Sequence, residues 1–384
     1  MIAYNRQYLD NRAVQTQASE ALAKKIITAQ EYQHIRASYP YHFYTPNIYI
    51  RAGLFLLTAV ILLCCLGIFM LGGVSSENGI GILLIFFGVV SYAALEFFIY
   101  DRKVYRSGID DALLWIASGL ILAGINLCTN HIDASMESLI VFLLATAAVL
   151  RYADHLMALV AYGACLSVIF HVTIGLGPAA RAFLPFLIMA VAGVLYLLFT
   201  RLSTEQRLRN YHSCLLLLRM ATLLSFYLAG NYYIVRELNA NISGSSGPVA
   251  LSWLWWLLTV IIPIIYLIRG IQKKDIIFLW AGLALVAAAI FTVRYYYHIL
   301  PAELAMIIGG SVLIGGTYGL IRYLHSPKYG LTSIASDDPH LLEKLHIEAL
   351  IAAETFHTAA TQPADTGVHF GGGSGGGGGA TGEF

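Results

Sequence analysis

Charged residues are scarce in this chain. They make up 12% of its 384 residues, whereas hydrophobic residues make up 58%. Soluble globular proteins carry about 25% charged residues, because a water-facing surface needs them. The scarcity argues against an ordinary soluble domain and indicates a protein that crosses a lipid bilayer several times. The formal net charge is only +1. Since a strongly basic stripe is also missing, the sequence predicts no nucleic-acid partner.

The motifs of common membrane enzymes are missing as well. The sequence contains no HExxH zinc motif, no GxSxG serine motif and no Walker A loop. Its cysteines show no CxxC or metal-ligand spacing and are expected to be small buried hydrophobic residues. They are Cys64, Cys65, Cys128, Cys165 and Cys214. We therefore predict no catalytic residue and no cofactor.

One scattered group of side chains on the predicted outer side could in principle converge on a metal ion. It comprises His131, Asp133, Glu137, His298 and Glu303. The group lacks the close, regular spacing of protein metal sites. We therefore interpret these residues as solvated loop side chains and predict no metal site.

Ten hydrophobic runs are long enough, or nearly so, to cross a bilayer as helices. About 20 residues span a hydrocarbon core of about 30 Å. The predicted spans are 52–73, 79–99, 112–128, 137–150, 156–175, 182–200, 214–234, 250–268, 276–292 and 302–321. The fourth is only about 21 Å long. It needs either Ser135 and Met136 or shelter from neighbouring helices to cross. We predict an all-α, polytopic transmembrane helix bundle of about ten spans.

The distribution of Lys and Arg predicts the orientation of the bundle. Cytoplasmic loops of membrane proteins carry an excess of both residues. If the N-terminus lies inside, only Arg181, Arg236 and Arg294 of the 23 Lys and Arg residues fall in outside loops. Adding or removing one span would reverse this bias in all later loops. We therefore predict that both termini are cytoplasmic.

The two ends of the chain predict cytoplasmic structure. Residues 5–27 have the apolar spacing of an amphipathic helix, and the stretch 28–31 fits a capping box that starts a second helix. Asp338 and Pro339 suit the start of a later helix. We predict four parts. They are an N-terminal helical hairpin (1–50), a transmembrane domain (51–322), a linker with an amphipathic helix (323–357) and a disordered glycine-rich tail (358–384).

Several partners are predicted in addition to the lipid bilayer. The apolar stripe of the predicted C-terminal helix has three interpretations. It packs on the N-terminal hairpin, it docks a protein partner together with the tail, or it lies on the membrane surface. Ser311, Gly315 and Gly319 recur every four residues in the tenth run. Small residues at this spacing let two helices approach closely. They predict helix packing, either within the bundle or between two copies in a homodimer.

Arg219 lies in the apolar stretch CLLLLRMATLL, residues 214–224. An ionisable residue inside a span is costly, and this makes it a candidate functional residue. One interpretation is that its side chain extends back to the interface. A second is an ion pair with Glu96, which lies at a similar depth in the second run. In a third, one or both residues form a substrate or proton site. Arg219 and Glu96 are therefore the candidate site residues.

The order of parts also resembles a known family. A short polar hairpin, the segment YPYHFYTPNIYIRAGLFLL (39–57) and a series of apolar runs resemble an uncharacterised family of bacterial predicted polytopic membrane proteins, a domain of unknown function. The resemblance covers the hairpin and the first four runs and rests on their layout. It implies a bacterial cytoplasmic (inner) membrane. It implies no activity and no functional residues.

Three functions fit these features. A non-enzymatic scaffold, assembly or sensing component fits the helical cytoplasmic ends and the lack of catalytic motifs. A small-solute transporter fits ten spans divided into two inverted halves, although matching breaks in the two halves are missing. A membrane-embedded transferase would need an active site in a loop. The longest outside loop, 235–249, is rich in Gly and Ser and is expected to be flexible.

Overall fold

The computed structural model describes residues 2–72, 76–129, 132–243 and 249–297, and residues 307, 310, 311, 314, 315, 318, 319 and 322. The chain divides into two compact units, Met1–Leu331 and Thr332–Phe384. All described residues belong to the first unit. The predicted C-terminal helix and the glycine-rich tail therefore lie outside the described residues.

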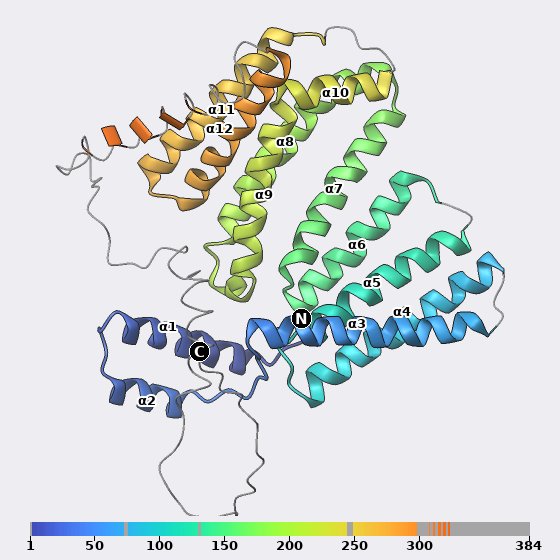
Figure 1. Ribbon diagram of the computed structural model, residues 1–384, viewed down its shortest axis with the longest axis vertical. Coiled ribbons are helices and arrows are strands. Elements are labelled where there is room, and N and C mark those ends of the chain that lie inside the picture. The colour runs from blue at the N-terminus through green and yellow to red at the C-terminus, as the bar shows by residue number, and fades with distance from the viewer. Residues whose placement is uncertain are drawn as a thin grey trace, which may run out of the picture. The chain divides into compact units, whose positions relative to one another are not determined.

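The N-terminal residues form a helical hairpin of α1 (Arg6–Ala23) and α2 (Ala29–Ser38) (Figure 1). The predicted capping box is confirmed. Thr28 accepts a hydrogen bond from the backbone N–H of Glu31, and the Glu31 carboxylate accepts one from the N–H of Thr28. The hairpin is joined across its two helices by Gln15, whose amide donates to the carbonyl oxygen of Tyr39 at 2.7 Å. All of α2 remains accessible, because none of its residues is buried.

Ten further α-helices and one 3₁₀ helix follow in the described part. They are α3 (Ile48–Leu71), α4 (Glu77–Asp101), α5 (Ile109–Cys128), α6 (Ala134–Tyr152), α7 (His155–Gly175), α8 (Pro178–Leu202), η1 (Gln206–Tyr211), α9 (His212–Gly230), α10 (Tyr232–Ser243), α11 (Ser252–Lys273) and α12 (Ile276–Tyr296). Within the described ranges, nine helical segments are long and apolar enough to cross a membrane, with η1 and α9 counted together. The predicted all-α, polytopic architecture is confirmed. Most of the tenth predicted run lies outside the described residues.

Two elements refine the predicted layout. Helix α6 extends the short fourth run to 19 residues and includes Ser135 and Met136. It is therefore about 28 Å long, close to the thickness of the hydrocarbon core. The expectation of a flexible outside loop over 235–249 is wrong for its first part, because α10 is helical there. Asn231 interrupts the seventh span, and its side chain caps α10 by accepting from the N–H of Tyr233 at 2.9 Å.

Neighbouring helices pair as antiparallel hairpins, most extensively α4 with α5, α6 with α7, α8 with α9 and α11 with α12 (Figure 1). Glycines allow the closest pair, because a Cβ at Gly81 would lie 2.9 Å from the carbonyl oxygen of Gly124. A Cβ at Gly124 would lie 2.6 Å from the carbonyl oxygen of Gly81. Small residues give this close backbone approach between membrane helices.

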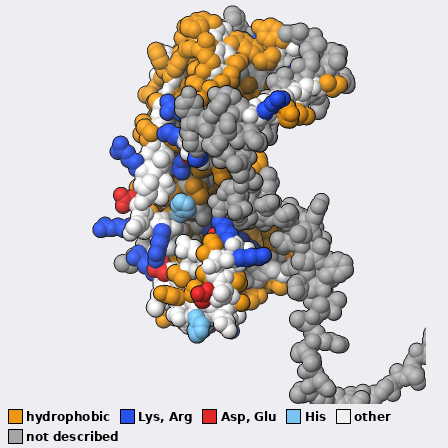
Figure 2. Space-filling view, turned by 90° about the vertical axis from the view of Figure 1, so that its left-hand side faces the viewer, with side chains coloured by type: hydrophobic (Ala, Val, Ile, Leu, Met, Phe, Trp, Pro, Cys, Tyr) orange, Lys and Arg blue, Asp and Glu red, His pale blue; other side chains and the backbone are white. Residues whose placement is uncertain are grey.

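The exposed surface of the spans is apolar. Helix α3 buries none of its residues, although its mean hydropathy is the highest of the candidate spans. Figure 2 shows a broad hydrophobic area on one face, with Lys and Arg side chains gathered in a separate zone. An exposed apolar surface of this kind suits contact with lipid tails, so the architecture is that of a multi-pass membrane protein.

One end of the spans gathers several of the segments predicted to be cytoplasmic, and we call it the basic end. It is formed by the N-terminal segment, the start of α3, the loops 102–108, 153–154 and 203–205, and η1. Tyr211 in η1 donates to the carbonyl oxygen of Leu150 at 2.5 Å. The N–H of Ala3 donates to the carbonyl oxygen of Arg151 at 2.7 Å. These contacts bring η1 and the N-terminal segment to the same end of α6.

Candidate functional site

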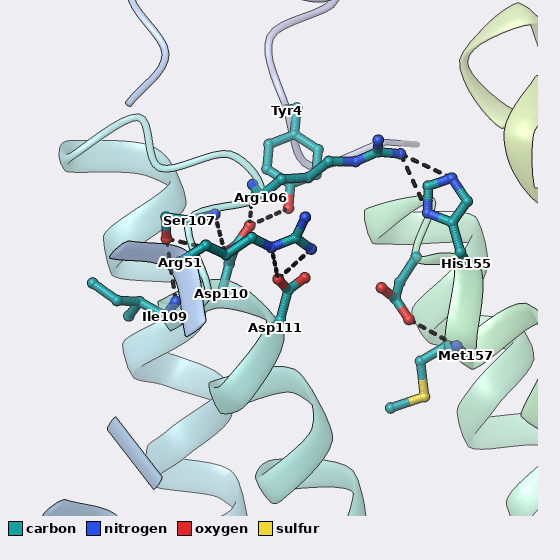
Figure 3. Close-up of polar contacts among 10 residues, drawn as sticks. Tyr4, Arg51, Arg106, Ser107, Ile109, Asp110, Asp111, His155 and Met157 are labelled. Carbon is teal, nitrogen blue, oxygen red and sulfur yellow. Dashed lines mark hydrogen bonds and ion pairs between the residues drawn. The ribbon is translucent and has the colours of Figure 1, made fainter. Parts of the chain in front are cut away.

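A group of polar side chains, which we call the polar cluster, lies at the basic end (Figure 3). Its members come from four separate parts of the chain: the N-terminal segment, the first turn of α3, the α4–α5 loop with the first turn of α5, and the start of α7. They are Tyr4, Arg51, Arg106, Ser107, Asp110, Asp111 and His155. The polar cluster thus joins segments that are distant in sequence.

Asp110 is the centre of the polar cluster and is 3% exposed. Its carboxylate accepts from the N–H of Arg106 at 2.7 Å, the N–H of Ser107 at 2.9 Å and the Ser107 hydroxyl at 3.1 Å. The Ser107 hydroxyl oxygen accepts in turn from the N–H of Ile109 at 3.2 Å. These bonds satisfy backbone donors of the loop that would otherwise lack partners at the start of α5.

Gly108 allows the first turn of α3 to lie directly against the α4–α5 loop. Gly108 has a φ of +92°, a conformation that favours glycine. A Cβ at Gly108 would lie 2.1 Å from the carbonyl oxygen of Arg51. The backbone of α3 therefore contacts the loop directly, and any larger residue at position 108 would separate the two.

Two arginines extend the polar cluster. Arg51 donates through Nε at 3.0 Å and through Nη2 at 2.6 Å to Oδ2 of Asp111. The Asp111 side chain is 19% exposed, and charge-assisted bonds to a partly desolvated carboxylate are among the stronger ones. Arg106 Nη2 lies 3.0 Å from Nε2 and 3.2 Å from Nδ1 of His155. A neutral imidazole accepts from Nη2 at whichever nitrogen lacks a proton.

Tyr4 attaches the N-terminal segment to the polar cluster. Its hydroxyl donates to Oδ2 of Asp110 at 3.3 Å, and the residue is 7% exposed. Burial, and then the negative charge of Asp110, hold the pKa of Tyr4 well above its ordinary value. Tyr4 therefore stays protonated at neutral pH and remains a donor to the carboxylate.

Aromatic contacts attach the other end of the hairpin to the same loop. Phe43 stacks on Tyr105 with ring centroids 5.1 Å apart, and Tyr4 meets Tyr105 edge to face at 4.8 Å. Beside them, the N–H of Tyr44 donates to the carbonyl oxygen of Lys103 at 3.2 Å. The N–H of Tyr105 donates to the carbonyl oxygen of Tyr44 at 3.3 Å. The hairpin is therefore fastened at its beginning and at its end.

The polar cluster is closely filled. Its cavity has a volume of about 20 Å³, which is comparable to the space that one water molecule needs. Each charged side chain already contacts another member of the polar cluster. General acid–base catalysis requires a side chain that can reach a substrate, and this arrangement leaves no room for one. The geometry suits a structural joint between the hairpin and the spans.

The structure does not pair the two predicted candidates with each other. Glu96 accepts instead from Arg151, from Nε at 2.5 Å and from Nη2 at 2.7 Å. The hydroxyl of Tyr152 also donates to Glu96. The predicted Glu96–Arg219 ion pair is therefore wrong. Arg151 lies in the last turn of α6, where the sequence suggested only a loop charge. Its guanidinium group, rather than that of Arg219, is the one within hydrogen-bond distance of Glu96.

Arg219 has a partner that the sequence analysis did not identify. Its Nη2 donates to Oδ2 of Asp275 at 2.7 Å, and the two side chains are 13% and 23% exposed. Asp275 also caps α12 through the N–H of Ile277 at 3.0 Å. Arg219 Nε is buried and has no hydrogen-bond partner among the described residues. The pair joins α9 to the α11–α12 turn and favours the interpretation of Arg219 as an internal structural residue.

The remaining candidates are placed only in part. Ser311, Gly315 and Gly319 are helical and exposed. No described atom comes within 4 Å of a Cβ added at Gly315 or at Gly319, so the small-residue stripe does not pack against the described helices. Of the five side chains considered for a metal, His131, His298 and Glu303 lie outside the described residues. Among residues that are described, no group of three metal-ligating side chains occurs.

A second buried polar group stabilises the break between α9 and α10. Asn231 is 3% exposed, and its amide donates to the hydroxyl of Tyr227 at 2.8 Å and to that of Thr292 at 3.0 Å. The hydroxyl oxygen of Thr259 accepts from the N–H of Tyr232 at 2.9 Å. Helix α11 and helix α12 thus supply partners for the polar groups that the break exposes, as a break at membrane depth requires.

Comparison with known proteins identifies no relative. No family model, no curated protein and no solved structure matches the chain.

Proposed function

We propose that this chain is a non-enzymatic scaffold, assembly or sensing component of a bacterial cytoplasmic (inner) membrane. In this proposal the N-terminal hairpin contacts a protein partner on the cytoplasmic side. The observation that carries the proposal is the contrast between the two parts of the hairpin. Its two ends are fastened to the α4–α5 loop and the first turn of α5 through Tyr4, Phe43 and Tyr44, whereas α2 buries no residue.

A fastened base gives the hairpin a defined position relative to the spans. Ordering a flexible segment on binding costs conformational entropy, and a pre-ordered segment avoids most of this cost. The long α1 is attached by Leu9, which is 8% exposed, and by the contact of the Arg12 guanidinium with the ring of Tyr105 at 4.7 Å. The exposed α2 is therefore presented on a supported element.

The polar cluster supports the same proposal. It connects the hairpin to α3, α5 and α7 through side chains that already contact each other, and its cavity of about 20 Å³ is too small for a substrate. A change in the packing of these spans would alter the attachment of Tyr4. This coupling would allow a sensing component to pass a signal to its cytoplasmic partner.

Two further parts of the chain extend the proposal. The helix predicted after Asp338, with the glycine-rich tail, would provide a second docking element. The stripe of Ser311, Gly315 and Gly319 would bring two copies together as a homodimer, since its described residues are exposed. These assignments rest on the sequence pattern.

Site-specific photo-crosslinking in living cells tests the proposal. A photoreactive amino acid replaces Gln30 or Gln33, both exposed on α2, and adducts are identified by mass spectrometry. The matched control places the same group at Glu205, which is exposed in the α8–η1 loop at the basic end. We expect one protein adduct from both α2 positions that is absent from the control. Adducts with lipid alone, or the same adducts at all three positions, would contradict the proposal.

A further inference from the structure

A second hollow at the basic end is separate from the polar cluster. It has a volume of about 310 Å³ and lies between the first turn of α1 and η1. Its size is at the lower end of the range of about 300–1,000 Å³ that is typical of small-molecule sites. Unlike the cavity of the polar cluster, it has room for a ligand.

The lining of this hollow is strongly basic. Arg6, Arg207 and Arg209 line it, and Asp10 is its only acidic lining residue. Asp10 is already paired with Arg209. Among the described residues, no carboxylate lies within ion-pair distance of Arg6 or Arg207. The hollow therefore carries two guanidinium groups whose charge is not balanced by a neighbour.

The two walls are held in position by contacts with residues that do not line the hollow. The hydroxyl of Tyr211 donates to the carbonyl oxygen of Leu150, which fixes η1 against the end of α6. On the other wall, the side chain of Asn5 accepts from the N–H groups of Gln7 and Tyr8, which fixes the start of α1 at Arg6. A site whose walls are held before binding loses less entropy on binding.

Two arginines in a hollow suit one ligand chemistry in particular. The planar guanidinium group donates two parallel hydrogen bonds to a phosphate, with charge assistance. Asn210 also lines the hollow and supplies amide donors. Because η1 directly precedes the span α9, the hollow lies near the depth of lipid headgroups, where basic pockets bind anionic lipids.

We propose that this hollow binds a phosphate group through Arg6 and Arg207. The phosphate belongs either to an anionic phospholipid headgroup or to a soluble phosphate compound. The proposal is independent of the hairpin's partner, since it concerns different residues and is tested on the purified chain alone.

The test measures thermal stability of the full chain, purified in a neutral maltoside detergent, with three additives. They are dihexanoyl phosphatidylglycerol, inorganic phosphate and, as the zwitterionic control, dihexanoyl phosphatidylcholine. We expect phosphatidylglycerol or phosphate to raise the midpoint in a saturable manner and phosphatidylcholine to leave it unchanged. A rise with phosphatidylglycerol alone assigns the site to a lipid headgroup. A rise with phosphate at a similar concentration assigns it to a soluble compound.

Variants connect the effect to the hollow. The pair Arg6→Gln and Arg207→Gln should weaken the response at least about tenfold in ligand concentration, because two charge-assisted bonds are lost. Arg201→Gln is the matched control, since Arg201 is exposed in the last turn of α8 and does not line the hollow. If the double variant does not fold, the pair Arg6→Lys and Arg207→Lys keeps the charge but loses the bidentate geometry, and should show an intermediate response. No response in the native chain, or an equal response in the charge-removing variant, would overturn the proposal.

Discussion

Three ion pairs each join charged side chains of two different elements. Arg51 of α3 meets Asp111 of α5, and Arg151 of α6 meets Glu96 of α4. The third pair joins Arg219 of α9 to Asp275 at the α11–α12 turn. A charge that is partly removed from water needs a close partner to offset the cost of desolvation. These residues therefore specify which helix ends lie together.

The sequence allowed one residue of two of these pairs to be found, but not its partner. Arg219 and Glu96 were recognisable because each interrupts an apolar run. Their partners were not, because Arg151 and Asp275 lie at span ends, where charged residues are common and several lie at the same depth. The polar cluster had one visible signal, the adjacent acids Asp110 and Asp111 at the start of the third span, but their bonds depend on tertiary packing.

The Arg219–Asp275 pair leads to a stability prediction. Arg219→Leu leaves the Asp275 carboxylate without its charged partner, and we expect a loss of roughly 1–3 kcal/mol in the free energy of unfolding. Arg219→Lys keeps the charge and should cost less. Thermal unfolding of the detergent-purified variants measures both effects. Equal midpoints for the two variants and the native chain would show that Arg219 only extends to the interface.

A double-mutant cycle with Asp275→Asn isolates the pair. Asn can still cap α12, so this change removes the ion pair while it preserves the helix start. The combined variant with Arg219→Leu should lose less stability than the sum of the two single changes. Additive losses would mean that the two side chains do not interact.

Tyr4 gives a second prediction at the scale of the residue. Tyr4→Phe removes the hydroxyl that donates to Asp110 and preserves the ring contacts with Tyr105. We expect the attachment of the N-terminal segment to weaken by about 0.5–1.5 kcal/mol. Limited proteolysis before Arg6 should then be faster. Tyr8→Phe is the control, because its ring contacts Phe43 but its hydroxyl has no part in the polar cluster. Equal cleavage of both variants would contradict the role of the hydroxyl.

At the scale of the element, local sequence signals were sufficient where a helix begins with its own cap. The capping box of α2 is confirmed at Thr28 and Glu31. The helix α10 was missed because its residues 235–243 are polar enough to read as a loop and because the break at Asn231 depends on Tyr227 and Thr292. Thr292 is 61 residues away from Asn231, and a partner so distant in sequence leaves no local pattern.

The capping box predicts a pH dependence for α2. Hydrogen bonds from the backbone N–H of Thr28, and then from its side chain, lower the pKa of Glu31 below its ordinary value of 4.5. A lowered pKa in the folded state means that the stabilisation is complete above the ordinary value and is lost as the pH falls through the lowered one. We expect the start of α2 to fray in that acidic range.

Hydrogen exchange of α2, corrected for intrinsic rates, measures this effect. The control is Glu31→Gln, which can still complete the capping box but has no charge to titrate in this range. Protection in the variant should not change with pH. A native chain whose α2 keeps the same protection across the range would contradict the prediction.

At the scale of the whole molecule, the hydrophobic runs predicted the architecture well, because length and apolarity alone decide whether a helix can cross a bilayer. The orientation remains a prediction. We expect Glu205→Cys to react with a membrane-impermeant maleimide only from the cytoplasmic side and Asn241→Cys only from the outer side. Both residues are exposed, and Asn241 lies in α10.

The labelling is measured on intact cells and on inside-out vesicles, in a chain whose five cysteines are replaced by serine or alanine. The cysteine-free chain is the control for background labelling. Reaction of both positions from one side would mean that the number of spans between them is even, and the ten-span topology would have to be revised.

The attachment of the hairpin also has a consequence for the synthesis of the protein. Tyr4 bonds to Asp110, a separation of 106 residues, and Asp10 pairs with Arg209, which is made later still. At about 5–20 residues per second, roughly 5–20 s pass between the appearance of Tyr4 and that of its partner. During this interval the hairpin has left the ribosome, while the loop that will hold it does not yet exist. The first part of the chain to be made therefore reaches its final position only after α5 has begun to appear, and completes its contacts only once η1 has been made.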